Sequence, residues 1–326
     1  MKDGIEAFNL VLENIIPEIK IPLSRIPNDY KEGVEEIRLR VNSPLNIYYK
    51  GKDYFISKDG LVSLNPNEGL SISLGEINKT FQLATNYSVY ALSDEIKNGF
   101  ITIRGGYRVG IGGKMIYGYS GIESIKDISS LNFRIARQKI GVSNHIIPKL
   151  LDERGNFHNT LIISPPQCGK TTLLRDIIRN LSNGSDGKEY RGFKIGVVDE
   201  RSEIAGIYNG IPQKDIGIRT DILDGCLKSQ GIMMLIRSMS PEIIAVDEIG
   251  GIEDAKAIDE ALRAGIKLIA TVHGTGIADI RMRNGLKSLF KEKVIKRFII
   301  LDNSLGVGTV REILDGETYQ DLMKGK

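Results

Sequence analysis

The second half of the chain alternates short apolar runs with amphipathic stretches. The apolar runs occupy residues 159–164, 194–199, 242–248 and 267–273. Helical spacing of apolar residues lies between them, at residues 169–181, 228–239 and 252–265. Short apolar strands separated by helices are typical of a parallel sheet that is covered on both faces. The pattern therefore predicts an α/β domain with a mostly parallel sheet over residues 141–326.

The first 140 residues have a different pattern, which predicts a smaller α+β domain over residues 1–140. Apolar residues first recur at helical spacing, at Ile5, Phe8, Leu12, Ile15 and Ile16. Alternating strands are expected at 35–41, 45–51 and 53–57, followed by helical stretches within 75–97. Residues 100–116 are expected to form a hairpin with glycine pairs at its bends, and 129–139 closes this half. In the second half, the polar, glycine-rich segment 184–192 is expected to be a loop.

Length and composition fit a soluble globular protein of two domains. The 326 residues are 41% hydrophobic and 26% charged, and 44 basic against 41 acidic side chains leave a formal charge of +3. Such a near-balance does not favour nucleic-acid binding, which usually needs a clustered basic excess.

The cysteines and the N-terminus bear on the location of the protein. Cys168 and Cys226 cannot form a disulfide framework, so we expect reduced thiols in a cytoplasmic protein. Acidic residues interrupt the apolar N-terminal segment 1–16, unlike a signal peptide, and no stretch reaches the ~18 apolar residues of a membrane span. The protein is expected to lie against a membrane without crossing it.

The segment SPPQCGKT (164–171) has the spacing of a phosphate-binding P-loop, with Ser164 in place of its first glycine. In such loops backbone N–H groups and the following helix N-terminus point at the phosphates of ATP. Gly169 permits their close approach, Lys170 reaches the β- and γ-phosphates, and the Thr171 hydroxyl binds Mg²⁺. The residues expected to bind the nucleotide are Ser164, Pro165, Pro166, Gln167, Cys168, Gly169, Lys170, Thr171 and Thr172.

A second chemical signal is the strand EIIAVDE (242–248), which ends in two carboxylates. Next to a P-loop, Asp247 is expected to hold Mg²⁺ directly or through water. Glu248 is expected to polarise the attacking water as a general base.

Two further strand ends carry candidate catalytic residues. Asp199 and Glu200 follow one strand and could support the metal and its waters, while Arg201 could pair with Glu203 or with a neighbouring subunit. His273 ends the strand after the Asp247–Glu248 strand and could sense the γ-phosphate. His145 and His158 lack such a context and are interpreted as structural.

The order of these segments resembles the type II and type IV secretion ATPases, whose ATPase domain has the RecA-like P-loop fold. DERSE (199–203) is similar to their acidic box, and RSMSPE (237–242) to the start of their strand-end motif. His273 corresponds to their histidine box. More closely, the chain resembles the stage III sporulation AA family of endospore-forming bacteria. The similar blocks cover nearly the whole chain: EEIRLRVNSPL, GFITIRGGYRVGIGGK, SPPQCGKTTLLRD, VVDERSEIAG, DILDGC, IRSMSPEIIAVDEIG and ATVHG. Departures are small, with Ser164 where the family tends to have glycine and Gly251 where a basic residue is common.

The resemblance implies a hexameric ring in which the N-terminal domain of one subunit caps the nucleotide of the next. It also implies a motor for a channel between mother cell and forespore, working with membrane proteins on the mother-cell side. Arg108, Arg134 or Arg137 could then reach a neighbour's γ-phosphate and stabilise charge in the transition state.

Two other functions remain open from the sequence. A nucleic-acid-dependent ATPase could use the same RecA-like core, but the chain has no Trp and no long basic block to bind single strands. Stimulation of the ATPase rate by single-stranded DNA or RNA would favour it. A non-catalytic nucleotide switch would not need Glu248, so unchanged hydrolysis in Glu248→Gln would remove the general-base mechanism.

Overall fold

The computed structural model describes residues 4–119, 121–185, 190–291, 293–304 and 306–324. The chain forms two compact units, of which the first contains residues 1–137 together with 206–213. The second contains residues 138–205 and 214–326. The sequence pattern gives no sign that the short segment 206–213 belongs to the first unit. A boundary between independently folding domains near residue 140 stays a prediction.

The first unit is built on a seven-stranded antiparallel sheet in the order β5-β4-β3-β1-β9-β8-β7. Its strands are β1 (Val34–Arg40), β3 (Asn46–Tyr49), β4 (Lys52–Ile56), β5 (Val62–Ser63), β7 (Phe100–Ile103), β8 (Tyr107–Gly118) and β9 (Gly121–Arg134). Two short pairs accompany it, β2 (Ser43–Pro44) with β6 (Ser71–Ile72) and β12 (Ile207–Tyr208) with β13 (Ile211–Pro212).

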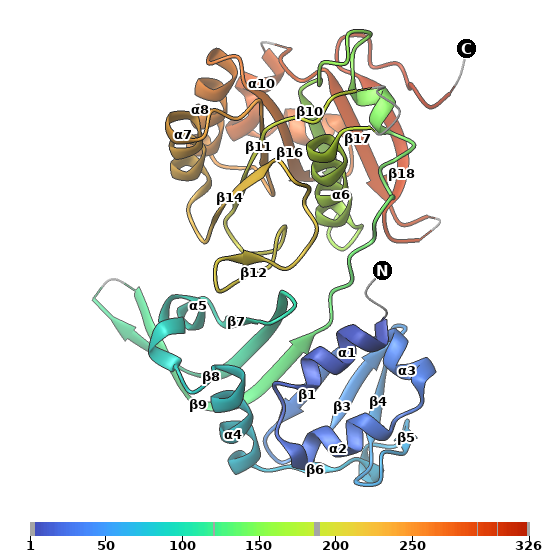
Figure 1. The fold of residues 1–326 in the computed structure, drawn as a ribbon, viewed down its shortest axis with the longest axis vertical. Coiled ribbons are helices and arrows are strands. Elements are labelled where there is room, and N and C mark those ends of the chain that lie inside the picture. The colour runs from blue at the N-terminus through green and yellow to red at the C-terminus, as the bar shows by residue number, and fades with distance from the viewer. Residues whose placement is uncertain (1–3, 120, 186–189, 292, 305, 325–326) are drawn as a thin grey trace. The chain divides into compact units, whose positions relative to one another are not determined.

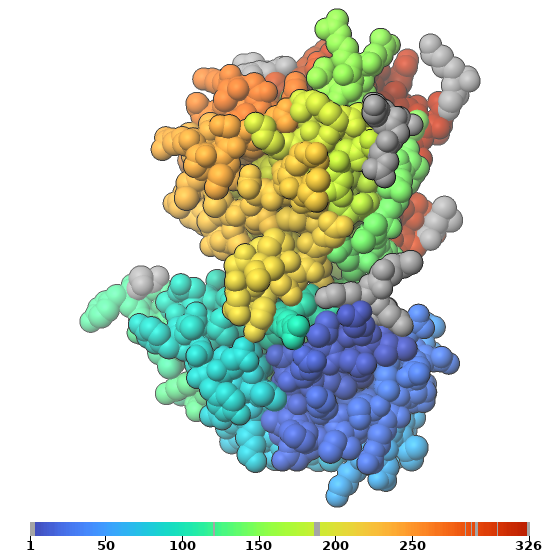
Figure 2. Space-filling view, in the orientation of Figure 1, coloured from blue at the N-terminus to red at the C-terminus, as the bar shows by residue number. Residues whose placement is uncertain are grey.

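Helices cover this sheet and close its core. They are α1 (Gly4–Leu12), α2 (Pro17–Arg25), α3 (Asn28–Gly33), α4 (Leu74–Ala84) and α5 (Ser93–Lys97), with single turns η1 (Pro66–Glu68) and η2 (Val89–Leu92). Helices α1–α3 lie over β1, β3 and β4, whereas α4 and α5 contact β9 (Figure 1). In the space-filling view the dark blue N-terminal segment forms much of the visible surface of this unit (Figure 2).

The helical stretches predicted within 75–97 are present as α4, η2 and α5, with a break after α4 where Asn86 and Tyr87 have positive φ. Two other predictions for this unit need correction. In the N-terminal apolar pattern, Ile15 and Ile16 do not continue the helix, because α1 ends at Leu12 and they lie in the connection to α2, which begins at Pro17. The glycine pair Gly105–Gly106 does form the bend between β7 and β8, but the second glycine pair of that segment lies inside β8 at a register shift. A glycine pair in a strand can thus mark a bulge instead of a turn.

The second unit is an α/β domain with a seven-stranded sheet in the order β14-β11-β15-β16-β10-β17-β18. Its strands are β10 (Thr160–Ser164), β11 (Ile195–Asp199), β14 (Thr220–Asp224), β15 (Ile243–Val246), β16 (Lys267–His273), β17 (Arg297–Asp302) and β18 (Thr309–Asp315). All neighbours pair in parallel except β17 with β18, so the predicted mostly parallel sheet is confirmed.

Helices cover both faces of the parallel strands (Figure 1). They are α6 (Lys170–Asn183), α7 (Lys228–Ser238), α8 (Ile252–Arg263), α9 (Ile277–Arg281) and α10 (Lys287–Lys291), with single turns η3 (Ile147–Leu150) and η4 (Asn284–Leu286). One core cluster joins α7, α8 and α10 to strand residues such as Leu161 and Ile163. Ile162, which points to the opposite face, is equally buried, and α6 contacts the sheet outside that cluster.

The predicted elements of this unit agree with the structure to within a few residues. Residues 186–189 of the predicted loop 184–192 lie outside the described part of the chain. Since β10, β11, β15, β16 and β17 run in parallel, their carboxyl ends meet at one edge of the sheet, where ligands bind in open α/β folds.

Candidate functional site

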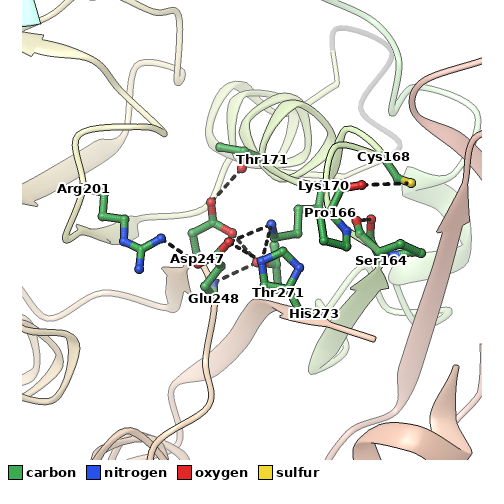
Figure 3. A network of polar contacts seen from close by, with 11 residues as sticks. Ser164, Pro166, Cys168, Lys170, Thr171, Arg201, Asp247, Glu248, Thr271 and His273 are labelled. Carbon is green, nitrogen blue, oxygen red and sulfur yellow. Dashed lines mark hydrogen bonds and ion pairs between the residues drawn. The ribbon is translucent and has the colours of Figure 1, made fainter. Parts of the chain in front are cut away.

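The P-loop segment connects β10 to α6 at this edge (Figure 3). The turn has left-handed backbone at Gln167 (φ 61°) and at Gly169 (φ 85°). Gly169 adopts this conformation without strain because it has no Cβ atom. Helix α6 begins at Lys170 with no side-chain cap, so backbone N–H groups of its first turn are available to an anion. The loop therefore has the form of a phosphate cradle.

Ser164 replaces the first glycine of the motif without backbone strain. It is the last residue of β10, it is fully buried, and it has no positive φ. Its Oγ donates a hydrogen bond to the Pro165 carbonyl oxygen at 2.7 Å. The unusual backbone angles of this loop fall three and five residues later, so Ser164 does not disturb the cradle.

Asp247 lies directly opposite the start of α6, just beyond the end of β15. The Thr171 hydroxyl donates to Asp247 Oδ2 at 2.7 Å, and the Thr271 hydroxyl donates to Asp247 Oδ1. The Thr171 hydroxyl and the Asp247 carboxylate offer two hard oxygen ligands side by side. Such a pair suits Mg²⁺, whose remaining ligands would be water and phosphate oxygens. Among the described residues no group of three or more His, Cys, Asp and Glu side chains could hold a metal by itself.

Glu248 is the centre of the charged network (Figure 3). Its Oε1 lies 2.8 Å from Lys170 Nζ and 2.7 Å from His273 Nε2, and its Oε2 lies 3.0 Å from Arg201. The Lys170 and His273 nitrogens are themselves 3.3 Å apart. Burial raises the pKa of Glu248, but the hydrogen bond and charge of Lys170, with His273 and Arg201, outweigh it, so its pKa is lowered. The carboxylate form of Glu248 is therefore favoured.

The backbone of Glu248 is fixed by the neighbouring strand. Glu248 has φ 55°, a left-handed angle that is uncommon outside glycine. Its N–H donates to Thr271 Oγ1 at 2.9 Å, while the same hydroxyl donates to Asp247. A single threonine on β16 thus orients both carboxylates that follow β15.

The acidic segment after β11 forms a closed turn. The buried Asp199 carboxylate accepts backbone N–H bonds from Glu203, Ile204 and Ala205 at 2.8–2.9 Å. Burial raises the pKa of Asp199 to about 6, against the lowering effect of these hydrogen bonds. From the opposite side Arg175 of α6 donates to the carbonyl oxygens of Glu203 and Ile204. The turn is thereby attached to the helix that starts in the P-loop.

Glu200 lies beside this turn and forms an ion pair with Lys228 of α7. A pocket at the edge of the sheet is lined by Asp199, Glu200, Arg201, Glu203, Lys228, Asp247 and Glu248. Most of these side chains are carboxylates, so the pocket suits a cation and ordered water better than a free anion.

The structure brings Lys170, Thr171, Asp247, Glu248 and His273 together, as their positions at strand and loop ends predicted. It places Asp199 and Glu200 at the same edge, but their contacts are with the turn and with Lys228. The catalytic roles of all these residues stay predictions.

The sequence did not reveal the roles of Thr271, Arg175 and Lys228. Thr271 could have been found, because it precedes His273 by two residues on β16 and so faces the same side of the sheet. Arg201 was expected to pair with Glu203 or a neighbouring subunit, and it forms an ion pair with Glu248. That contact joins segments 47 residues apart, which no local pattern reports.

The remaining histidines lie elsewhere in the second unit. His158 precedes β10, at the opposite edge of the sheet from Lys170. Burial lowers the pKa of His158, and the charge of Arg297 adds to this effect. His145 is exposed in the segment before η3.

The three candidate arginines of the first unit each have a contact within it. The Arg108 guanidinium lies 3.9 Å from the centroid of the Phe100 ring. Arg134 lies 3.5 Å from a Glu36 carboxylate oxygen, and Arg137 donates to the Val34 carbonyl at 3.1 Å. Their proposed action on a neighbouring nucleotide stays a prediction. Within the described residues, no helix is long and apolar enough to cross a membrane.

The fold is shared with solved secretion-type ATPases. The ATPase DotB of Legionella pneumophila is 17% identical with a TM-score of 0.53, over 82% of this chain and 72% of that chain. DotB of Yersinia pseudotuberculosis is 15% identical with a TM-score of 0.55, over 87% of this chain and 76% of that one. The pilus retraction motor PilT with bound ADP is 14% identical with a TM-score of 0.50, over 84% of this chain and 76% of that chain. At these identities the likeness concerns the fold alone, a RecA-like P-loop domain preceded by an N-terminal domain.

Sequence comparison identifies the family. Stage III sporulation protein AA of Bacillus subtilis (strain 168) is 44% identical over 305 residues, which are 93% of this chain and 94% of that protein. The protein SEEDLING PLASTID DEVELOPMENT 1 of Arabidopsis thaliana is 32% identical over 164 residues, 50% of this chain and 22% of that protein. The family model described as sporulation stage III, protein AA matches residues 10–320, and the chain belongs to this family.

Proposed function

We propose that this protein is a Mg²⁺-dependent ATPase. The observation that carries the proposal is the meeting of Lys170, Thr171, Asp247, Glu248 and His273 at the carboxyl edge of one parallel sheet. A phosphate cradle, an oxygen pair for a divalent cation and a carboxylate are the groups that nucleotide hydrolysis needs in one place. The DotB proteins of Legionella pneumophila and Yersinia pseudotuberculosis, which share this fold, are ATPases, and this supports the proposal.

The binding roles follow from the geometry. The first-turn N–H groups of α6 and the Lys170 ammonium would hold the β- and γ-phosphates of ATP. Thr171 and Asp247, whose oxygens lie 2.7 Å apart, would hold Mg²⁺. The bound cation would supply neutralisation of the phosphate charge. Thr271 would keep Asp247 aimed at this position through its hydrogen bond.

The hydrolytic step would use Glu248 as the general base. Its lowered pKa keeps it deprotonated near neutral pH, so it can accept a proton from water. The water oxygen would form a bond to the γ-phosphorus, the bond to the β–γ bridging oxygen would break, and ADP would leave. His273 Nε2, 2.7 Å from Glu248, would respond to the charge on the γ-phosphate. Asp199 and Glu200 would support the site. Asp199 would do so by holding its turn, and Glu200 through its ion pair with Lys228.

We further assign the protein to a motor of the secretion type. It would assemble into a homo-oligomeric ring of six subunits and act on membrane proteins of a sporulation channel, at the mother-cell side of the forespore. Membership of the sporulation family and the fold shared with DotB and PilT support this assignment. If it is correct, the protein should sediment with membranes from sporulating cells and be released when its membrane partners are deleted. Equal amounts in the membrane fraction with and without those partners would contradict it.

The first experiment measures ATPase rate against protein concentration, with particle size in parallel. The parent should show a specific rate that rises as a large oligomer forms, since sites shared between subunits are completed by assembly. Lys170→Ala should abolish the rate, because it removes the charge that binds the β- and γ-phosphates. The matched control is Lys256→Ala on the exposed face of α8, which removes an equal charge away from the site and should keep the parent rate.

The outcomes separate the parts of the proposal. A flat specific rate from a monomer would leave the ATPase and reject the shared-site ring. A parent that binds ATP without hydrolysing it, even as an oligomer, would reject the enzyme and favour a nucleotide switch.

A further inference from the structure

The P-loop has two flanks, because β10 lies between β16 and β17 in the sheet. On the β16 side it faces His273, and the carboxylates of Asp247 and Glu248 lie on the same side. On the β17 side it faces the connection from β17 to β18, since β17 runs parallel to β10 and ends at the same edge. Figure 1 shows β17 and β18 beside β10 at the C-terminal side of the domain.

This connection, the β17–β18 turn (described residues 306–308), touches the P-loop directly. The Gly308 N–H donates to the Cys168 carbonyl oxygen at 3.0 Å. A Cβ atom on Gly169 would lie 3.0 Å from Gly308 Cα and 3.2 Å from Val307 Cγ1. Main chain and side chain of the turn therefore pack against the outside of the phosphate cradle, 139 residues away in sequence (308 − 169).

The turn offers an open apolar surface at this position. Val307 is 61% exposed although it contacts the P-loop. Gly306 (φ 112°) and Gly308 (φ 92°) hold backbone angles that glycine favours, and a Cβ atom on either would meet no atom of the described residues within 4 Å. Small residues on both sides thus leave the Val307 side chain uncovered, with free space next to it.

If the site binds ATP as proposed above, the residues on the two flanks of the P-loop decide in which direction the nucleotide lies across it. Thr171 and Asp247 would hold Mg²⁺, and Glu248, 2.8 Å from Lys170, would reach the water that attacks the γ-phosphate. The γ end then lies on the β16 flank, so the triphosphate runs across the loop and the nucleoside leaves on the β17 flank. A purine ring is flat and largely apolar on its faces, and such ligands pack against apolar side chains beside a few polar groups.

We infer that the β17–β18 turn is the nucleoside subsite, in which Val307 supports the purine ring and ribose of ATP while Gly306 and Gly308 leave room for them. The inference rests on the proposed ATPase function. Val307 is a binding residue for the part of the substrate that does not react. It therefore contributes to nucleotide affinity and not to the chemical step.

Calorimetric titration in MgCl₂ with ATP and with inorganic tripolyphosphate tests this assignment. Tripolyphosphate has the three phosphates without the nucleoside. Val307→Asp should weaken ATP binding about tenfold or more, because an apolar contact of about 1.4 kcal/mol is lost and a negative charge is added near the phosphates. Since the charge also acts on tripolyphosphate, the uncharged, isosteric Val307→Thr is the decisive variant. It should weaken ATP binding about threefold and leave tripolyphosphate binding unchanged.

Ile218→Thr provides the matched control. Ile218 is 79% exposed and lies two residues before β14, at the opposite edge of the sheet, so its replacement should alter neither titration. Val307→Leu keeps an apolar surface and should bind ATP as tightly as the parent.

Equal weakening of both ligands in Val307→Thr would mean that Val307 acts by shaping the phosphate cradle, and unchanged ATP binding would mean that the nucleoside lies elsewhere. Either result overturns the subsite. A parent that binds tripolyphosphate but gains nothing from the nucleoside of ATP would overturn it too, while leaving a phosphate site. A parent that binds neither ligand would reject the proposed function itself.

Discussion

Thr271 shows how much one side chain contributes at the edge of the sheet. Its hydroxyl has one proton, which it donates to Asp247, and it accepts the Glu248 N–H with a lone pair. Glu248 has a left-handed φ of 55°, a conformation that costs about 1–2 kcal/mol for an L-residue. The Thr271 hydrogen bond offsets part of that cost and fixes the direction of the Glu248 side chain.

Replacing Thr271 with Val should therefore lower turnover more than substrate binding. Valine has the same shape but neither donates nor accepts, so both carboxylates lose their common anchor. With each lost hydrogen bond worth about 1–3 kcal/mol, we expect kcat for ATP to fall about ten- to a hundredfold, with KM changed less than about threefold. Steady-state ATPase kinetics on the assembled protein measure both quantities.

Thr271→Ser is the control for this prediction, because it keeps the hydroxyl and removes only a methyl group. It should retain most of the parent kcat. A kcat in Thr271→Val equal to the parent value, or an equal loss in both variants, would show that packing and not the hydroxyl is what matters at this position.

The turn after β11 is held by two charged side chains. Asp199 binds its backbone N–H groups and Arg175 of α6 binds its carbonyl groups. The pKa of Asp199 is raised to about 6 by burial, against about 3.9 in an unfolded chain. Between these values the folded protein binds more protons than the unfolded one, so its free energy of unfolding falls as the pH rises.

Asp199 should thus make stability depend on pH in a defined window. Relative to an Asp199→Asn variant, the parent should lose on the order of 2 kcal/mol of its free energy of unfolding between pH 4 and pH 7, with most of the change below pH 6.5. Urea unfolding of both proteins at several pH values in this range gives the difference. Two profiles that stay parallel would show that Asp199 ionises alike in the folded and unfolded chain.

The elements that could be predicted from sequence are those whose own residues decide their structure. Strands β10, β11, β15 and β16 are continuous apolar runs, and such runs between helices have few alternatives. Because parallel strands end at one edge, the meeting of Lys170, Asp247, Glu248 and His273 could be predicted as well. By contrast, Gly112–Gly113 could mark either a turn or a bulge, and only the register with β9 decides between them.

Contacts between distant segments could not be predicted in the same way. The Arg201–Glu248 ion pair and the packing of Gly308 on Cys168 depend on the order of strands in the sheet, which apolar periodicity does not report. β17 and β18 belong to this class as well. They were not predicted as strands, although β17 completes the flank on which we place the nucleoside.

The chain passes between the two units at 137–138, 205–206 and 213–214. The last two crossings enclose the hairpin of β12 and β13, which belongs to the first unit. At its base the Lys214 N–H donates to the Ala205 carbonyl at 3.1 Å, and the Ala205 N–H is bound by Asp199. The hairpin is therefore continuous with the turn at the candidate site, so a displacement of one has a direct covalent route to the other.

Within the first unit, the hairpin of β12 and β13 packs closely against the bend between β7 and β8. A Cβ atom on Gly206 would lie 3.0 Å from Gly106 Cα, and the Gly105 N–H donates to Gln213 Oε1 at 2.9 Å. Gly210 lies in the bend of the same hairpin, and no described part of the chain comes within 4 Å of its Cβ position. Both Gly206 (φ 58°) and Gly210 (φ 76°) are left-handed, so the two positions differ in the space around them more than in backbone strain.

Gly206→Ala and Gly210→Ala should consequently differ in cost. Each alanine carries about 1–2 kcal/mol of backbone strain, but only Gly206→Ala also presses on Gly106 and should lose about 1–3 kcal/mol more. Thermal unfolding gives the difference in stability, and the rate of proteolytic cleavage within 206–213 reports whether the hairpin has loosened from its unit. Faster cleavage in Gly206→Ala alone would identify the Gly106 contact as what seats the hairpin. Equal cleavage and stability in the two variants would mean that backbone strain accounts for both, and the close approach of Gly206 to Gly106 would then add nothing to the stability of the first unit.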